Sequence, residues 1–353
     1  MESKDIKKTE GAQPENGSAF FALVEELLAP LAKRAADILK KRYGLVGDRD
    51  AKTLEHIGGD YGITRERVRQ IVGDAMRTIS KSAVSDNFKK AEEKIIFAIE
   101  KNNGIIEEKE AVDILDPDGK KESNAIRFIV ECSKRIRTVS QKNLIEKSWA
   151  VSDSAFKQAK DVARVAEDIL KKGKVPLKGS DLSEKVAAEF PGFSKEQAFS
   201  FMKVLARVKK NKFGKWGIYD WNDINPKGSR EKINLVLKEE GKPLHFTEIA
   251  KSIDKHGLSK KKTHPQTIHN ELIKDDNFVL IGRGIYALRE WGYYEGTIKD
   301  VIRNILAESK EPLQKEKILQ SVFKVRKVKK TTVMINLNNP DFFKKEGEYY
   351  SLK

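Results

Sequence analysis

A pattern of about 69 residues occurs four times in this chain, and this repeat constrains the fold more than any other feature. Turn signals lie at intervals of 69, 68 and 69 residues, at Gly104, Gly173, Gly241 and Lys310. Each turn is followed by a short apolar or proline-containing step, such as Val175-Pro176-Leu177. Equal spacing over four copies is typical of tandem units that contact mainly their neighbours. We therefore expect small modules that share little core.

Each copy combines helical periodicity with an aromatic C-terminal segment. In the second copy, apolar residues occur at i, i+3, i+4 and i+7, beginning at Val162. The terminal segments are short, aromatic and typical of two-stranded hairpins; they contain Trp149, Trp216, Tyr286 and Tyr350. Three helices with a hairpin make up a winged helix, which is a helix-turn-helix with a β-ribbon appended. The alternative is a generic α+β repeat without a nucleic-acid role.

The sequence therefore predicts a mainly α fold with small β-wings, in which an N-terminal helix-turn-helix precedes about four tandem winged-helix modules. The low apolar content at the N-terminus indicates a disordered leader. The predicted boundaries are 1–18 for the leader, 19–84 for the helix-turn-helix, and 85–153, 154–227, 228–293 and 294–353 for the four winged-helix modules.

The net charge points to a polyanionic partner. Lys and Arg number 69 against 53 Asp and Glu, which gives +16. By copy, the charge is −1 for residues 85–153, +7 for 154–227, +3 for 228–291 and +6 for 296–353. Nucleic acid is the simplest polyanion to explain such an excess, although a merely basic soluble surface remains an alternative. The first copy is the poorest candidate for phosphate binding and suits a spacer or a protein contact.

Residues 53–72 carry the pattern of a helix-turn-helix. Thr53 can cap a short helix, Gly62 fits the turn, and Thr64 can cap the helix that follows. That second helix begins with charged and amide side chains that share one face by helical spacing: Arg65, Glu66, Arg69 and Gln70. Arg and Gln can form two hydrogen bonds with base edges, and Glu can accept from cytosine, so these residues are predicted to contact bases. A solvated charged face is the alternative.

The segment from Leu39 to Leu45, followed by Thr53 to Ile71, resembles the fourth conserved region of housekeeping-type bacterial sigma factors. This resemblance implies binding to a promoter −35 element and docking on RNA polymerase. By position, Arg65, Glu66, Arg69 and Gln70 match the family's base-contacting residues; Thr53 and Thr64 match positions beside the phosphates, and we add Arg67 to the predicted DNA-binding set. The promoter-melting regions of a full sigma factor are expected to be absent.

A second resemblance covers the third copy, residues 228–291. Pro243 to Ala250, Thr267 to Leu272, and the string Gly-Arg-Gly-Ile-Tyr-Ala-Leu-Arg-Glu-Trp ending at Trp291 resemble a HARE-type helix-turn-helix. The same family includes the N-terminal domain of the RNA polymerase delta subunit. We assign Arg283 and the lysines Lys260, Lys261 and Lys262 to the basic wings, where they are predicted to contact phosphate.

Motifs for catalysis or metal binding were not found in the sequence. The five histidines are scattered, and His264 and His269 do not fall on one helix face. The single cysteine, Cys132, lies among apolar residues and suits a buried, inert thiol. No phosphate-binding loop with the Gly-x-x-x-x-Gly-Lys pattern occurs. We therefore expect no enzyme activity, no cofactor, no metal and no small-molecule substrate.

Two functions remain after these exclusions. The first is a sequence-specific DNA-binding transcription factor related to sigma factors, with double-stranded DNA and bacterial RNA polymerase as partners. It would act in the cytoplasm, in association with the nucleoid, and away from the membrane, because no apolar run of 18 residues occurs. The alternative is an adaptor, associated with RNA polymerase or with a defence system, whose winged helices mainly bind proteins.

Overall fold

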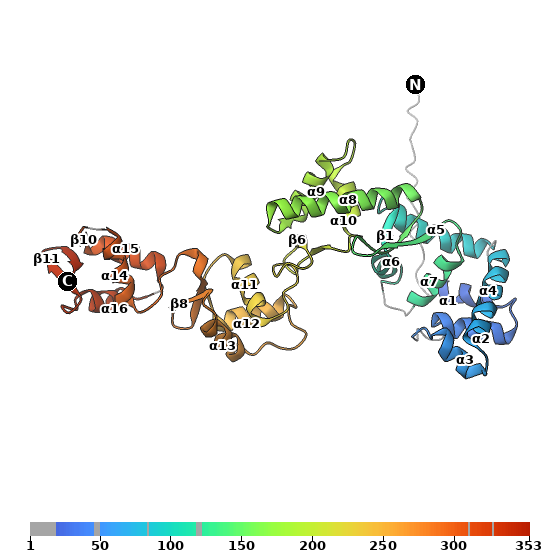
Figure 1. The fold of residues 1–353 in the computed structure, drawn as a ribbon, viewed down its shortest axis with the longest axis horizontal. Helices are drawn as coiled ribbons and strands as arrows, with labels where there is room; N and C mark the ends of the chain where they lie inside the picture. The colour runs from blue at the N-terminus through green and yellow to red at the C-terminus, as the bar shows by residue number, and fades with distance from the viewer. Residues whose placement is uncertain (1–18, 46–49, 83–84, 118–121, 310, 327) are drawn as a thin grey trace, which may run out of the picture. The chain divides into compact units, whose positions relative to one another are not determined.

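The computed structural model describes residues 19–45, 50–82, 85–117, 122–309, 311–326 and 328–353. The predicted leader at 1–18 and the turn residue Lys310 lie outside these described residues. Within them, the chain forms sixteen α-helices and four small antiparallel sheets of three strands each (Figure 1). The predicted class, mainly α with small β-wings, is therefore confirmed. Among the described helices, none has both the length and the apolar character that crossing a bilayer requires.

Four helices form the N-terminal module: α1 (Ala19–Leu28), α2 (Lys33–Tyr43), α3 (Leu54–Tyr61) and α4 (Arg65–Ser82). The first is held by its apolar face, since Leu23, Val24 and Leu27 are all buried. The second ends at Gly44, whose φ of 66° is the left-handed conformation that terminates helices with little cost only at glycine. The helix and turn positions predicted from the sequence are thus present.

The four winged-helix modules share one order of elements, namely helix, strand, helix, helix, strand, strand. The first contains α5 (Asp86–Glu100), β1 (Ile105–Glu107), α6 (Glu108–Leu115), α7 (Ser123–Cys132), β2 (Arg137–Gln141) and β3 (Ile145–Ala150). The second contains α8 (Asp153–Gly173), β4 (Leu177–Lys178), α9 (Gly179–Ala188), α10 (Lys195–Met202), β5 (Val208–Lys210) and β6 (Lys215–Ile218). The third contains α11 (Ser229–Glu240), β7 (Leu244–His245), α12 (Phe246–Lys255), α13 (Pro265–Lys274), β8 (Phe278–Gly282), β9 (Ile285–Leu288) and a short 3-10 turn, Arg289–Trp291. The fourth contains α14 (Ile298–Ser309), β10 (Leu313–Gln314), α15 (Lys315–Val325), α16 (Lys330–Leu337), β11 (Phe343–Glu346) and β12 (Tyr349–Leu352).

Each wing is a three-stranded sheet rather than the predicted two-stranded hairpin. The short apolar step after each turn forms the extra strand, which pairs with the last strand of its module, giving orders such as β1-β3-β2 and β7-β9-β8. In the third module, Leu244 lies opposite Tyr286 in this pairing. The aromatic residues that recur at equivalent positions are all buried, with exposed fractions of 1% for Trp149, 6% for Trp216, 2% for Tyr286 and 2% for Tyr350. They therefore act as packing residues.

The described residues divide into two compact units, each of which packs mainly on itself. The first comprises the described residues up to 172 together with 180–208. The second comprises 173–179 and the described residues from 209 onwards.

In the first unit, the N-terminal module and the first winged-helix module share one hydrophobic core. Helix α1 packs on α5 and α7, as Figure 1 also shows, and α4 contacts α7. One continuous buried cluster includes Leu27 of α1, Ile79 of α4, Phe128 of α7 and Trp149 of β3. The prediction that neighbouring modules share little core is therefore wrong for this pair.

In the second unit, the third and fourth modules keep separate cores and are joined by polar contacts. Arg326, which follows α15, is only 6% exposed, and its guanidinium donates to the backbone carbonyls of Leu280 in β8 and of Gly296. Burial lowers the pKa of the Arg326 guanidinium, while the Asp300 carboxylate acts in the opposite direction. The connection between the modules is also held by the hydroxyl of Tyr294, which donates to Glu308 over 2.5 Å.

Replacing Arg326 with methionine is expected to open this connection. The carbonyls of Leu280 and Gly296 would lose their donor, and a hydrogen bond to a charged group contributes about 1.5–3 kcal/mol. We expect chymotrypsin to cleave after Tyr293 or Tyr294 at least about tenfold faster than in the wild type, followed by mass spectrometry. Arg303→Met is the control, because Arg303 is exposed and lies 4.0 Å from Asp300. Equal cleavage rates in the two variants would contradict the bridging role of Arg326.

Candidate nucleic-acid interface

Helices α3 and α4 form a helix-turn-helix whose two starts are capped as predicted. The Thr53 hydroxyl accepts from the backbone N–H of His56 over 3.2 Å, and the Thr64 hydroxyl accepts from that of Arg67 over 3.2 Å. Both threonines are exposed. Each cap satisfies a helix N–H that would otherwise lack a partner, and each leaves a helix start accessible to an anion.

Two glycines set the turn between these helices. Gly62 has φ of 62° and ends α3, while its N–H donates back to the carbonyls of Gly58 and Gly59. Gly58 lies against the turn itself, and a Cβ built at this position would be 2.6 Å from the carbonyl oxygen of Ile63. The sequence pattern identified Gly62, whereas the close approach at Gly58 became visible only in the structure. Together they fix how α4 leaves the turn.

The first two turns of α4 present the predicted base-contacting residues to solvent. Val68 is fully buried and packs with Ile57 and Ile38, so it anchors the opposite face of the helix. The exposed residues of this segment are Arg65, Glu66, Arg67, Arg69 and Gln70. The structure thus places the five predicted residues together on the accessible side of one capped helix.

These side chains also contact one another. Arg69 forms a double hydrogen bond with Glu66, with Nε to Oε2 at 2.9 Å and Nη2 to Oε1 at 2.6 Å. This contact lowers the pKa of the Glu66 carboxyl and raises that of Arg69. Arg67 donates to Oε1 of Gln70 over 3.1 Å. Both charged groups of the Arg69–Glu66 pair are more than half exposed, so water screens the pair and leaves it free to exchange for a base edge.

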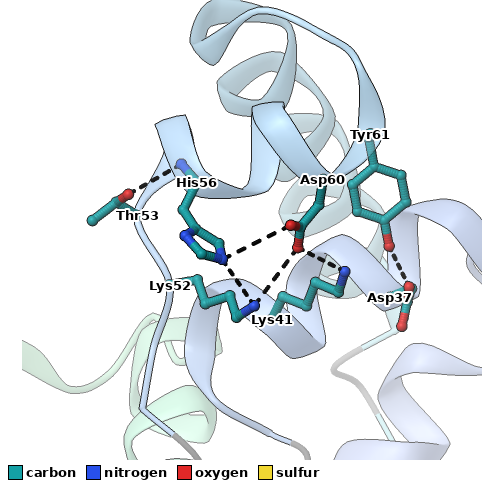
Figure 2. A network of polar contacts seen from close by, with 7 residues as sticks. All are labelled: Asp37, Lys41, Lys52, Thr53, His56, Asp60 and Tyr61. Atoms are coloured by element: carbon teal, nitrogen blue, oxygen red, sulfur yellow. Dashed lines mark hydrogen bonds and ion pairs between the residues drawn. The ribbon is translucent and has the colours of Figure 1, made fainter.

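A polar network on the other side of α3 fixes this helix to α2 (Figure 2). The Asp60 carboxylate lies 2.9 Å from Nζ of Lys41, 3.7 Å from Nζ of Lys52 and 3.8 Å from Nε2 of His56. The hydrogen bond with Lys41 is the main cause that lowers the pKa of Asp60. Beside it, the hydroxyl of Tyr61 donates to Asp37 of α2. Sequence analysis missed this network, because its members come from different helices and follow no spacing.

The predicted phosphate-contacting residues of the third module occupy two different places. Arg283 lies in the β8–β9 turn, as expected for a wing. Lys260, Lys261 and Lys262 do not: they lie in the loop between α12 and α13, the two helices of the helix-turn-helix. The assignment of these lysines to the wing is therefore wrong. All four side chains are exposed, and none forms an ion pair or hydrogen bond within the part of the chain that the structure describes.

The first winged-helix module presents no such surface among its described residues. Its helix α7 corresponds in order to α13, but most of its residues are buried against α1 and α4, including Ile126, Phe128 and Ile129. Arg127 of this helix is held by Glu108 over 2.8 Å. The predicted use of this module as a spacer or protein contact agrees with this packing.

Cys132, at the end of α7, is a buried thiol as predicted. It is 4% exposed, and burial raises its pKa to about 12. Such a thiol is protonated at neutral pH and has little nucleophilic character.

Two segments match known families. Residues 27–81 match Sigma-70, region 4, and residues 231–291 match HARE-HTH, the ASXL and restriction endonuclease HTH domain. The RNA polymerase sigma factor SigA1 of Synechococcus elongatus is 42% identical over 78 residues, which are 21% of this chain and 19% of that protein. The RNA polymerase sigma factor SigA of Clostridium acetobutylicum is 37% identical over 87 residues, which are 24% of this chain and 23% of that protein. The chain thus matches about a fifth of the length of these relatives, and both resemblances stated from the sequence are confirmed.

Proposed function

We propose that the protein is a sequence-specific DNA-binding transcription factor related to sigma factors. It recognises a −35-like promoter element through α4, acts at the nucleoid in the cytoplasm, and has no catalytic role. The observation that carries this proposal is the cluster formed by Arg65, Glu66, Arg69 and Gln70 on the exposed face of a capped second helix. A guanidinium fork, a carboxylate and an amide can each distinguish base edges in the major groove.

RNA polymerase is the proposed protein partner. Its support is the similarity of residues 27–81 to Sigma-70, region 4, together with relatives that are RNA polymerase sigma factors. Pull-down of core polymerase with the full chain tests this contact separately from DNA binding. An adaptor that binds proteins alone is the second candidate, and the buried α7 face favours protein contact for the first winged-helix module only.

Arg69→Ala is expected to relax specificity. Losing one guanidinium contact to a base should cost about 1–3 kcal/mol on the preferred duplex and much less on a scrambled one. The measurement is a competition titration of the full chain against matched and scrambled duplexes over a salt series. A steep salt dependence supports DNA binding, because each neutralised phosphate contributes about 0.9 to the log–log slope.

Arg77→Ala is the matched control for this experiment. Arg77 lies on the same helix, is exposed, and pairs with the carboxylate three residues before it, Asp74, as Arg69 pairs with Glu66. We expect it to leave the ratio between the two duplexes unchanged. Equal weakening of both duplexes by Arg69→Ala would show that α4 does not recognise bases.

A further inference from the structure

Helix α13 of the third module carries an exposed stripe of a composition suited to bases. Ile268 and Leu272 are buried with about 1% exposure and hold the inner face of the helix. The exposed residues occur at i, i+1, i+4, i+7 and i+8, and are Gln266, Thr267, Asn270, Ile273 and Lys274. Positions with this spacing lie on one side of a helix. The stripe contains two amides, a hydroxyl, a 64% exposed isoleucine and a cation, but no carboxylate.

The two amides are hydrogen-bonded to each other. Nε2 of Gln266 donates to Oδ1 of Asn270 over 3.2 Å. This bond leaves Oε1 of Gln266 as an acceptor and Nδ2 of Asn270 as a donor, and neither has another partner among the described residues. In the major groove, adenine offers a donor at N6 and an acceptor at N7. The amide pair is therefore complementary to an adenine edge, and the exposed Ile273 can contact the methyl group of thymine.

The charges around the stripe favour a duplex over a protein. Lys260, Lys261 and Lys262 lie in the loop directly before α13, and Arg283 lies in the wing turn of the same module. All four are exposed, and none forms an ion pair or hydrogen bond with the described residues. A polar stripe preceded by unneutralised cations is complementary to a groove bordered by phosphates.

The equivalent helices of the other modules lack this combination. Helix α7 is mostly buried, and the end of α10 is tied to the first module, where Lys203 lies 2.7 Å from Glu110. Helix α16 is exposed at Ile335, but the amide of Asn336 donates to the carbonyl of Thr332 of its own helix over 2.8 Å. Among the four winged-helix modules as described, α13 thus has the surface best suited to contact bases.

We propose that α13 is a second base-recognising helix, which binds an A·T-containing element through Gln266 and Asn270 while the preceding lysines contact phosphate. This inference rests on the proposed function, because it requires that the chain bind duplex DNA. It assigns sequence specificity to a second site, distinct in residues from that of α4.

Selection of duplexes from a random pool with the full chain tests this assignment. Four proteins are compared: wild type, Gln266→Ala/Asn270→Ala, Arg69→Ala, and Gln320→Ala as the control. Gln320 is an exposed helical glutamine of the same unit, on α15 rather than on the second helix of its module. We expect the wild type and the control to enrich two sequence elements. The double variant should lose the A·T-containing element and keep the other, whereas Arg69→Ala should do the reverse.

Titration of the double variant against the selected duplex and a duplex with G·C substitutions in that element gives the magnitude. We expect about a tenfold loss of preference, while binding to the substituted duplex and the melting temperature stay unchanged. If the double variant enriches both elements like the wild type, the α13 proposal is overturned, and this face is then a protein-binding or merely solvated surface. If the wild type enriches no sequence at all, the proposed function itself fails, so the two failures are distinguishable.

Discussion

Phe128→Ala is expected to lower the free energy of unfolding of the first unit by about 3–5 kcal/mol, the usual loss when a buried phenylalanine is truncated in a core. Phe128 is fully buried on α7, and its ring meets that of Tyr43 on α2 edge to face, with centroids 5.0 Å apart. The phenylalanine therefore connects the winged-helix module to the helix-turn-helix module. Because the core is continuous, the loss should affect both modules together.

Hydrogen exchange with mass spectrometry measures this coupling directly. In Phe128→Ala, peptides from α3 and α4 should exchange faster, although Phe128 lies outside both helices. Tyr286→Ala is the control, because Tyr286 is a similarly buried aromatic residue of the second unit. It should destabilise the third module and leave the exchange of α3 and α4 unchanged. Unaltered protection of α3 and α4 in Phe128→Ala would show that the two N-terminal modules fold independently.

The local elements of this fold were predictable from the sequence because each depends on neighbouring residues. Thr53, Gly62 and Thr64 fixed the ends of α3 and α4 through capping and a left-handed turn, and both ends were found where expected. The recurring aromatic residues likewise predicted the wings. The third strand of each sheet was missed, since a two-residue strand such as Leu177–Lys178 is too short to show alternation.

Contacts between modules were not predictable in the same way. An amphipathic pattern shows that a helix has a buried face, but it does not identify the partner that covers it. One signal was present in α7, whose residues Ala125, Ile126, Phe128, Ile129 and Val130 leave little polar surface. A helix that is apolar nearly all round is typical of a shared interior, and this pattern could have predicted the joint core.

Charge counts had a similar limit at the proposed DNA surfaces. The lysine run at 260–262 was recognised as basic, but composition could not distinguish a wing from the loop before α13. The structure resolves the difference, because β8 begins only at Phe278. The place matters for mechanism, since a loop before the second helix of a helix-turn-helix lies close to the start of that helix, where phosphates bind.

Replacing Lys260, Lys261 and Lys262 together with glutamine is therefore expected to weaken binding to every duplex. The three side chains are exposed and unpaired among the described residues, so their charges are available to phosphates. If each neutralises one phosphate, the log–log salt slope should fall by about 2.7 units, and affinity near ~0.15 M salt by a factor on the order of a hundred. Fluorescence titration of matched and scrambled duplexes at several salt concentrations measures both quantities.

A second triple variant separates local contact from overall charge. Lys238, Lys315 and Lys344 belong to the same unit, and each already lies within 3.4 Å of a carboxylate oxygen, on Asp223, Glu316 and Glu346 respectively. Their replacement with glutamine removes the same formal charge. It should change the salt slope far less, because these lysines do not face DNA in our proposal and their charges are already balanced locally. If the two triple variants flatten the slope equally, binding reflects the net charge of the unit, and the loop before α13 has no specific contact with phosphate.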